Sequence, residues 1–204
     1  MPVAAGVEKV ILGIDPGTNV MGYGLLRVTD RKPELMVMGV LQLKKLESHY
    51  LRLKRIYERV LGLIEQYHPD ELAIESPFVG INPSSMIKLC RAQGVAMAAA
   101  VERDIPIFEY SPAKVKIQIV GNGAASKEQV AAMVKNALHL SDADMDAKFD
   151  ASDAVAIALT HFYMTSKPGV VPAGGSKSRI PRSSGSGSSS WSTFVAQNAD
   201  RIHK

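Results

Sequence analysis

A chain of 204 residues with an apolar fraction of 46% is long enough for one globular domain with an appendage. Its single cysteine, Cys90, excludes an internal disulfide and a cysteine-based zinc site, and fits a reducing compartment. No apolar run reaches the roughly 18 residues of a membrane span, and the first residues show no signal-peptide pattern. We therefore expect a cytoplasmic protein that contacts no membrane.

The net charge of +4 is unevenly distributed along the chain. From Thr165 to Lys204, six basic residues face one acidic residue, so the rest of the chain carries about −1. Residues 167–204 are also rich in Gly, Ser and Pro, which predicts a flexible tail with one apolar stretch around Trp191 and Phe194. The predicted domain is thus residues 1–166, where a nucleic-acid ligand needs a local basic patch.

Three apolar runs near the start predict an antiparallel meander of strands. They cover Lys9–Asp15, Val20–Val28 and Leu35–Leu43, with turn-forming residues between them. Ser48 begins a predicted helix that ends at His68, because apolar residues recur there at helical spacing. The basic residues of this helix are predicted to form a solvated face: Arg52, Lys54, Arg55 and Arg59.

A short apolar run after this helix, Glu71–Glu75, predicts a strand parallel to the first, because a helical crossover separates the two. Both strands end in a carboxylate, Asp15 and Glu75 respectively, shortly before a proline. Parallel strands end at the same edge of a sheet, where ligands bind in open α/β sheets. The two carboxylates are therefore expected to flank one crevice. A turn-capping role for Asp15 stays open, since Asp-Pro-Gly is a common turn.

A long helix is predicted from Pro83 to Arg103. Its second half is small and apolar all round, which indicates burial against this domain or against a second copy of the chain. A short strand, Ile105–Glu109, follows it, and the segment Ser111–Val120 comes next. Ser126 is the predicted N-cap of a further helix.

The last predicted helix, Ala147–Tyr163, begins with two carboxylates. Asp150 and Asp153 are three residues apart and share a helix face. Acids at a helix start also favour the helix dipole, so a purely structural role stays open. The small apolar residues that follow predict close packing, which would point both acids at the sheet edge.

Four carboxylates thus come from two strand ends and one helix start: Asp15, Glu75, Asp150 and Asp153. Hard oxygen ligands select Mg²⁺ or Mn²⁺, and no His or Cys cluster competes for a softer metal. Two such ions about 3.5–4 Å apart clamp an in-line displacement at phosphorus. The sequence offers no good Ser-His or Cys-His nucleophile, so the chemistry indicated is metal-dependent phosphodiester hydrolysis.

Several blocks of the chain, in order and over about residues 9–164, resemble the RuvC family of bacterial Holliday-junction resolvases. They are GIDPG (13–17), GYG (22–24), AIE (73–75), RAQG (91–94), FEY (108–110), GNG (121–123) and DASDAVAIA (150–158). The resemblance implies a ribonuclease-H-like α/β fold, with a mixed five-stranded sheet flanked by helices. It implies a homodimer that resolves four-way DNA junctions by paired symmetric nicks in recombination and repair, leaving 5′-phosphate and 3′-hydroxyl ends.

The resemblance also assigns roles residue by residue. Asp15, Glu75, Asp150 and Asp153 match the family's metal-binding acids, which implies two Mg²⁺ ions per subunit. Phe78 matches an aromatic residue that stacks on a base, although alone it reads as a core residue. Lys116 and Lys127 match basic residues near the scissile phosphate, although alone they read as surface lysines. Weaker DNA-binding candidates are Asn82 and Lys114.

The chain departs from the family pattern at two places. Ile81 stands where many members have a basic residue, which puts one backbone contact in doubt. The tail extends past the usual end of the family core, and we expect it to add nonspecific DNA affinity or to contact a partner. The implied partners are junction DNA, a second copy of the chain and the RuvA–RuvB branch-migration proteins. The helix from Pro83 would supply much of the dimer interface.

Three other classes of protein share part of this pattern. An actin-like ATPase shares the Asp-x-Gly-Thr pattern, but the chain lacks a second phosphate loop and an adenosine-site glycine pair. A non-catalytic junction-binding module predicts that one of the four acids is missing, and all four are present. A ribonuclease-H-like nuclease that acts on RNA shares the metal chemistry, and Phe78 and the dimer helix argue against it.

Overall fold

The computed structural model describes residues 8–77, 82–141 and 151–166. Its elements, in chain order, are β1 (Lys9–Asp15), β2 (Val20–Thr29), β3 (Lys32–Gln42), α1 (His49–Tyr67), β4 (Glu71–Glu75), α2 (Pro83–Val101), β5 (Ile107–Tyr110), α3 (Pro112–Val120), α4 (Lys127–Ala137) and α6 (Ser152–Thr165). None of these helices combines the length and the apolarity that a membrane span needs.

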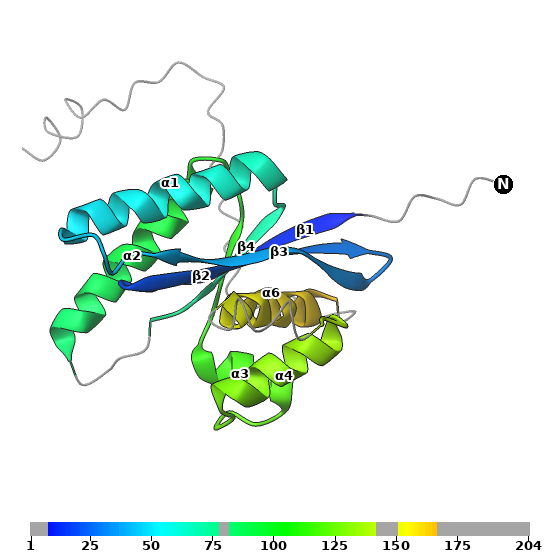
Figure 1. The fold of residues 1–204 in the computed structure, drawn as a ribbon. Coiled ribbons are helices and arrows are strands. Elements are labelled where there is room, and N and C mark those ends of the chain that lie inside the picture. The colour runs from blue at the N-terminus through cyan, green and yellow to red at the C-terminus, as the bar shows by residue number, and fades with distance from the viewer. Residues whose placement is uncertain (1–7, 78–81, 142–150, 167–204) are drawn as a thin grey trace, which may run out of the picture.

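The strands form one mixed sheet in the order β3-β2-β1-β4-β5. The first three strands pair antiparallel, whereas β4 runs parallel to both β1 and β5. Helices α1 and α2 cover one face, and α6 lies against the other, with α3 and α4 beyond it (Figure 1). The predicted five-stranded, helix-flanked architecture is confirmed.

Short polar side chains fix the helix starts, as their types predict. Ser48, Asn82, Ser111 and Ser126 each accept a hydrogen bond from a backbone N–H in the first turn of their helix. Ser126 forms a full capping box with Gln129. These caps set the ends of α1, α2, α3 and α4, so they also fix where the side chains of each first turn lie.

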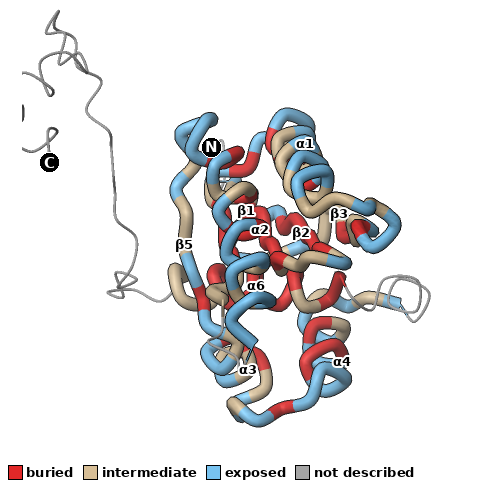
Figure 2. The backbone as a smooth tube through the Cα atoms, turned by 90° about the vertical axis from the view of Figure 1, so that its left-hand side faces the viewer, coloured by how far each residue is buried: buried red, intermediate tan, exposed pale blue. Residues whose placement is uncertain are grey.

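The sheet separates two apolar cores, and most of α6 is buried in the second. One core joins the sheet to α1 and α2, and the other joins it to α3, α4 and α6. Figure 2 shows buried backbone along the central strands and along α6. Residues 151–162 are buried apart from the half-buried Asp153, and most of them are small. A helix of alanines can lie very close to a sheet because few side-chain atoms separate the two backbones.

Glycines on β1 and β2 make that close approach possible. Gly13 pairs with Gly24 across the two strands. A Cβ atom on Gly13 would lie 2.2 Å from the Ala154 carbonyl oxygen, and one on Gly24 would lie 2.5 Å from Val155 Cγ2. Neither position has room for a side chain. The glycine pair is therefore the surface on which the start of α6 rests.

The far end of α6 is held by a buried polar network. The His161 ring is fully buried; its Nε2 contacts the Glu71 carboxylate and its Nδ1 lies 2.7 Å from the Tyr110 hydroxyl. Lys9 Nζ also bridges to Glu71 at 2.5 Å. Burial alone would raise the pKa of Glu71, but the hydrogen bonds from His161 and Lys9 hold it below its usual value. This network joins α6 to β1, β4 and β5.

Some sequence predictions differ from the structure. Arg52 and Arg59 do not belong to a solvated face of α1: Arg52 donates hydrogen bonds to the carbonyls of Leu46, Thr18 and Lys44, and Arg59 lies over the Tyr23 ring, 4.6 Å from its centroid. Burial of the second half of α2 within this domain is partial, because Gly94, Ala98 and Val101 are exposed, which leaves the predicted alternative of burial against a second copy open. Helical periodicity places a residue on a face, but it does not say whether a loop covers that face.

Element boundaries also moved by a few residues. Strand β3 begins at Lys32, before Pro33, because an edge strand tolerates a proline. Strand β5 is Ile107–Tyr110 where Ile105–Glu109 was predicted, and α2 ends at Val101. The predicted start of the last helix at Ala147 lies outside the described residues.

Candidate active site

Asp15 and Glu75 lie side by side at the carboxyl ends of neighbouring parallel strands. The register pairs Ile14 with Ile74, so the two acids follow at the same level. Gly13 packs against α6, and Ala73 belongs to the core on that side of the sheet. Because side chains alternate along a strand, Asp15 and Glu75 face the same side. The two strand ends therefore bring both carboxylates to one edge of the sheet, on the side that α6 covers.

Asp153 reaches this edge from the first turn of α6. The glycine pair lets Ala154 rest on β1, which places the neighbouring Asp153 beside the strand ends. The Asp153 side chain is 20% exposed, and its Oδ2 lies 2.8 Å from Lys127 Nζ. Lys127 is the first residue of α4, and its side chain is 66% exposed. The ion pair is therefore accessible to solvent on its Lys127 side.

The electrostatics of Glu75 show that these groups share one neighbourhood. Burial raises the pKa of Glu75, and the charges of Asp15 and Asp153 raise it further, to about 7. Lys127 and Lys116 lower it, but less strongly. Three of the four predicted acids and both predicted lysines thus lie within electrostatic reach of one another. A raised carboxylate pKa among like charges is typical of a functional site.

This raised pKa predicts a stability that falls with pH in the metal-free protein. The folded-state value of about 7 exceeds the ordinary 4.5, so Glu75 favours the folded state fully below pH 4.5. The contribution is lost as pH rises through 7, at a cost of up to about 3 kcal/mol. With EDTA present, thermal denaturation of Glu75→Gln is expected to show a smaller drop in Tm between pH 5 and pH 8 than the wild type.

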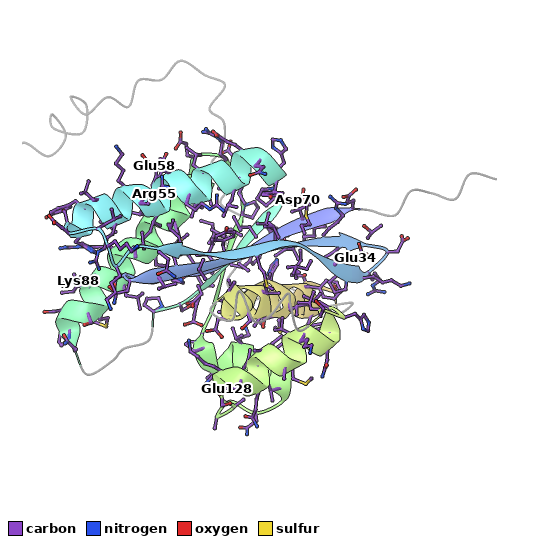
Figure 3. All side chains as sticks on the ribbon, in the orientation of Figure 1. Glu34, Arg55, Glu58, Asp70, Lys88 and Glu128 are labelled. Atoms are coloured by element: carbon purple, nitrogen blue, oxygen red, sulfur yellow. The ribbon has the colours of Figure 1, made fainter. Side chains whose placement is uncertain are left out.

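A matched control is Glu34→Gln. Glu34 is exposed on β3, far from the candidate site (Figure 3). Its variant is expected to keep the wild-type pH dependence of Tm. Equal pH dependence in Glu75→Gln and wild type would show that Glu75 titrates normally and that the acids are not crowded.

Gln93 supports the site from the opposite face of the sheet, and its role was not predicted. It is a buried polar residue on α2, and its Nε2 donates to the Glu75 carbonyl at 3.2 Å and to Glu109 Oε2 at 2.9 Å. These bonds fix the end of β4 against β5. The signals in the sequence were the place of Gln93 in the RAQG block and the small, apolar residues that follow it.

Of the remaining predicted site residues, the structure describes Asn82 and Lys114. Asp150 and Phe78 lie outside the described residues, as does Ile81. Asn82 is the exposed N-cap of α2, and its Oδ1 accepts from the Ser85 N–H. Lys114 Nζ lies 5.3 Å from the centroid of the Tyr110 ring. Within the described part of the chain, no three His, Cys, Asp or Glu side chains are arranged to hold a metal ion.

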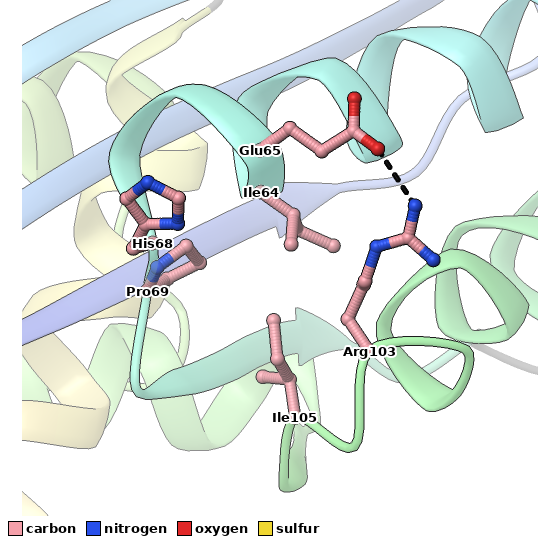
Figure 4. Close-up of a pocket in the computed structure, with 6 residues that line it drawn as sticks. All are labelled: Ile64, Glu65, His68, Pro69, Arg103 and Ile105. Atoms are coloured by element: carbon pink, nitrogen blue, oxygen red, sulfur yellow. Dashed lines mark hydrogen bonds and ion pairs between the residues drawn. The ribbon is translucent and has the colours of Figure 1, made fainter.

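A cavity of about 420 Å³ lies at the other end of the strands and takes no part in this site. It is lined by Ile64, Glu65, His68, Pro69, Arg103 and Ile105 (Figure 4). An ion pair of 2.7 Å between Arg103 and Glu65 spans its rim. Pro69 precedes β4, whereas Glu75 ends it, so the length of the strand separates this cavity from the acids.

The mixed five-stranded sheet, with acids at two adjacent strand ends and at a helix start, is the architecture of ribonuclease-H-like nucleases. A family model described as crossover junction endodeoxyribonuclease RuvC matches residues 11–161. Proteins of that name from Porphyromonas gingivalis and Bacteroides fragilis are 51% and 52% identical to this chain over 195 residues, which cover 96% of the chain and 97% and 96% of the relatives. The chain therefore belongs to the RuvC family of crossover junction endodeoxyribonucleases, and it is a nuclease.

Solved structures agree with this assignment. The structure of RuvC from Thermus thermophilus is 34% identical with a TM-score of 0.64, and the same protein in complex with a Holliday junction substrate is 35% identical with a TM-score of 0.68. Each match covers 76% of this chain and 94% of the other. The yeast mitochondrial Holliday junction resolvase Ydc2 shares the fold at 15% identity, with a TM-score of 0.57 and coverage of 74% and 77%.

Proposed function

We propose that this chain resolves four-way DNA junctions by paired symmetric nicks that leave 5′-phosphate and 3′-hydroxyl ends, in homologous recombination and DNA repair. The observation that carries the proposal is the shared neighbourhood of Asp15, Glu75 and Asp153 at one edge of the sheet, with Lys116 and Lys127 beside them. The junction complex of the Thermus thermophilus relative supports the substrate.

The donor set fits divalent metal ions. Carboxylate oxygens are the ligands that Mg²⁺ and Mn²⁺ prefer. Burial raises the pKa of Glu75, and the charges of Asp15 and Asp153 raise it further, so a cation between these carboxylates would offset their repulsion. Asp15, Glu75 and Asp153, together with Asp150, would hold two Mg²⁺ ions. When bound, the ions supply an activated water and neutralise charge at the departing oxygen. Mn²⁺ is the expected substitute.

The two lysines have a role beside the carboxylates. Lys127 now neutralises Asp153, so a cation on that carboxylate would release the Lys127 ammonium toward a phosphate oxygen. Lys116 is half-buried on α3 and lies near enough to Glu75 to lower its pKa. Both would stabilise negative charge that develops on the scissile phosphate. Phe78, Asn82 and Lys114 remain proposed DNA contacts.

The exposed face of α2 supports a homodimer. Ile87 and Val101 are 50% and 53% exposed, and Gly94 and Ala98 are exposed between them. These positions recur at helical spacing, so they lie on one face of the helix, with the exposed Arg91 among them. Two-fold symmetry in the enzyme would match the two-fold symmetry of the junction.

The division into a domain, residues 1–166, and a tail, residues 167–204, is also part of this proposal. Alignments of 195 residues with the Porphyromonas and Bacteroides relatives are longer than the domain, so the similarity extends into the tail. We assign to the tail nonspecific DNA affinity or a protein contact, with the RuvA–RuvB complex as the expected partner. Cytoplasmic localisation fits these partners.

The test is incubation of the pure protein with a labelled, branch-migratable four-way junction, with Mg²⁺ or with EDTA. A DNA duplex and an RNA–DNA hybrid run alongside. We expect magnesium-dependent conversion of the junction alone into two nicked duplexes, because the acids need a cation to act. Cleavage of the hybrid would move the function to RNA processing, and binding of the junction without cleavage would contradict the catalytic assignment.

A further inference from the structure

A polar cavity of about 300 Å³ lies on the other side of the β1–β2 turn from the carboxylates. Three elements line it: the turn with Thr18 and Asn19, the start of α1 with His49 and Arg52, and the start of α2 with Ser85 and Lys88. Figure 3 shows Lys88 on α2, at the end of the sheet opposite to Glu34. No role described above uses this cavity.

One residue that lines the cavity carries a buried polar atom without a hydrogen-bond partner. Within the described residues, His49 Nε2 is the one buried side-chain nitrogen or oxygen that lacks a hydrogen-bond partner. Buried polar atoms of native proteins almost always have a partner in the protein, in water or in a ligand. His49 lines the cavity, so a ligand bound there would lie next to this ring.

The charges around the cavity favour an anion. Burial lowers the pKa of His49, and the neighbouring charges of Arg91, Lys88 and Arg52 lower it further, so three cations lie around the ring. The first turns of α1 and α2 contain no acidic residue, so the positive ends of both helix dipoles are uncompensated by their own side chains. Glu47 is the carboxylate in the lining and opposes this attraction.

Arg52 makes the cavity a formed site. Its guanidinium donates to the Thr18 carbonyl and to Asn19 Oδ1, both at 2.9 Å, and to the Leu46 carbonyl at 2.9 Å. These bonds fix the β1–β2 turn against the start of α1. Lys88 and the Ser85 hydroxyl, both on exposed residues, remain on the accessible side of the cavity.

We propose that this cavity binds a backbone phosphate of the DNA strand that enters the carboxylate site, with His49, Ser85 and Lys88 as the contacting side chains. The inference rests on the proposed function and adds a second anchoring point to it. Asp15 is three residues before Thr18, so the two sites are at most about 11 Å apart along the chain at that point. A single strand that passes over the β1–β2 turn contacts both.

The experiment is junction binding in EDTA, followed by fluorescence anisotropy over a series of salt concentrations. Lys88→Gln is expected to weaken binding about tenfold and to reduce the slope of log K against log salt by about one, because one phosphate contact is lost. Glu47→Gln is expected to act in the opposite direction and to tighten binding. The matched control, Lys54→Gln, removes an exposed lysine of α1 and is expected to change neither quantity.

A second measurement separates this inference from the proposed function. Titration of the wild type with inorganic phosphate, observed through the His49 ring by NMR, is expected to shift the His49 signals and to shift them less in Lys88→Gln. If the wild type fails to prefer junctions but His49 responds to phosphate, the proposed function fails and the anion site stands. If Lys88→Gln and Glu47→Gln both bind the junction as the wild type does, the inference is wrong; a phosphate response would then indicate a free-phosphate site only.

Discussion

Asp15→Asn is expected to reduce junction cleavage at least about a thousandfold while junction binding is retained. An amide is a much weaker ligand for Mg²⁺ than a carboxylate, and metal-ion stabilisation of a phosphoryl transition state is worth several kcal/mol. Asp15 lies at the end of the central strand beside Glu75, so no other described group replaces its charge at that position. Asp153→Asn is expected to behave similarly.

The same variants are also expected to keep their affinity for the junction. Because Asp15 and Asp153 repel the phosphate backbone, either asparagine variant is expected to bind the junction in EDTA as well as, or better than, the wild type. Cleavage is measured under single-turnover conditions with Mg²⁺ and with Mn²⁺. Asp30→Asn is the matched control, since Asp30 is exposed in the β2–β3 turn with φ 52°, a conformation that asparagine also adopts. Full cleavage by Asp15→Asn would remove Asp15 from the catalytic centre.

The edge of the sheet that carries the acids could be predicted because the sequence patterns that indicate it are short and local. An apolar run that ends in a carboxylate and a breaker indicates both the strand and its end, and the structure places β4 at Glu71–Glu75 as predicted. The helical crossover between β1 and β4 makes them parallel, which brings Asp15 and Glu75 to the same edge. Two residues at strand ends could therefore be paired without knowledge of any long-range contact.

The packing that brings Asp153 to that edge was not predictable in the same way. Gly13 and Gly24 were visible as motif residues, but their common surface exists only once β1 and β2 pair. Likewise, the support that Gln93 gives to Glu75 depends on the seating of α2 across β4 and β5. Such contacts join residues far apart in sequence, and no local pattern encodes them.

The environments of Arg52 and His49 on α1 could not be predicted either, because they also depend on contacts between segments far apart in the sequence. A basic residue on an amphipathic helix is predicted to face water. In the structure, however, the β1–β2 turn and the segment before α1 accept four hydrogen bonds from the Arg52 guanidinium. His49 carried no signal at all, since a histidine at a helix start is ordinary. Only the folded arrangement shows its unsatisfied nitrogen.

Gly13→Ala is expected to lower both stability and cleavage, because α6 cannot keep its place above a methyl group. The added Cβ would lie 2.2 Å from the Ala154 carbonyl oxygen and 2.9 Å from Ala158 Cβ, and neither backbone nor an alanine can move aside by rotation. Overpacking of this kind costs about 1–3 kcal/mol, or a fall in Tm of roughly 2–4 °C per kcal/mol for a chain of this size.

The loss of activity is expected to exceed what the loss of stability explains. His161 holds the far end of α6 to Glu71 and Tyr110, so the helix is expected to tilt away from β1 at its start, where Asp153 lies. A displacement of about 1 Å in a catalytic group can cost about a hundredfold in rate. Cleavage is therefore compared well below the Tm of the variant, where the protein is folded.

Gly62→Ala provides the control for a glycine replaced by alanine. Gly62 is exposed in the middle of α1, with nothing within 4 Å of an added Cβ, so its variant is expected to gain about 0.5–1 kcal/mol and to cleave normally. If Gly13→Ala had the same Tm and the same cleavage rate as the wild type, α6 would tolerate a larger separation from β1. In that case the position of Asp153 would depend on its ion pair with Lys127 rather than on the glycine pair, and Lys127→Ala would be the variant that displaces it.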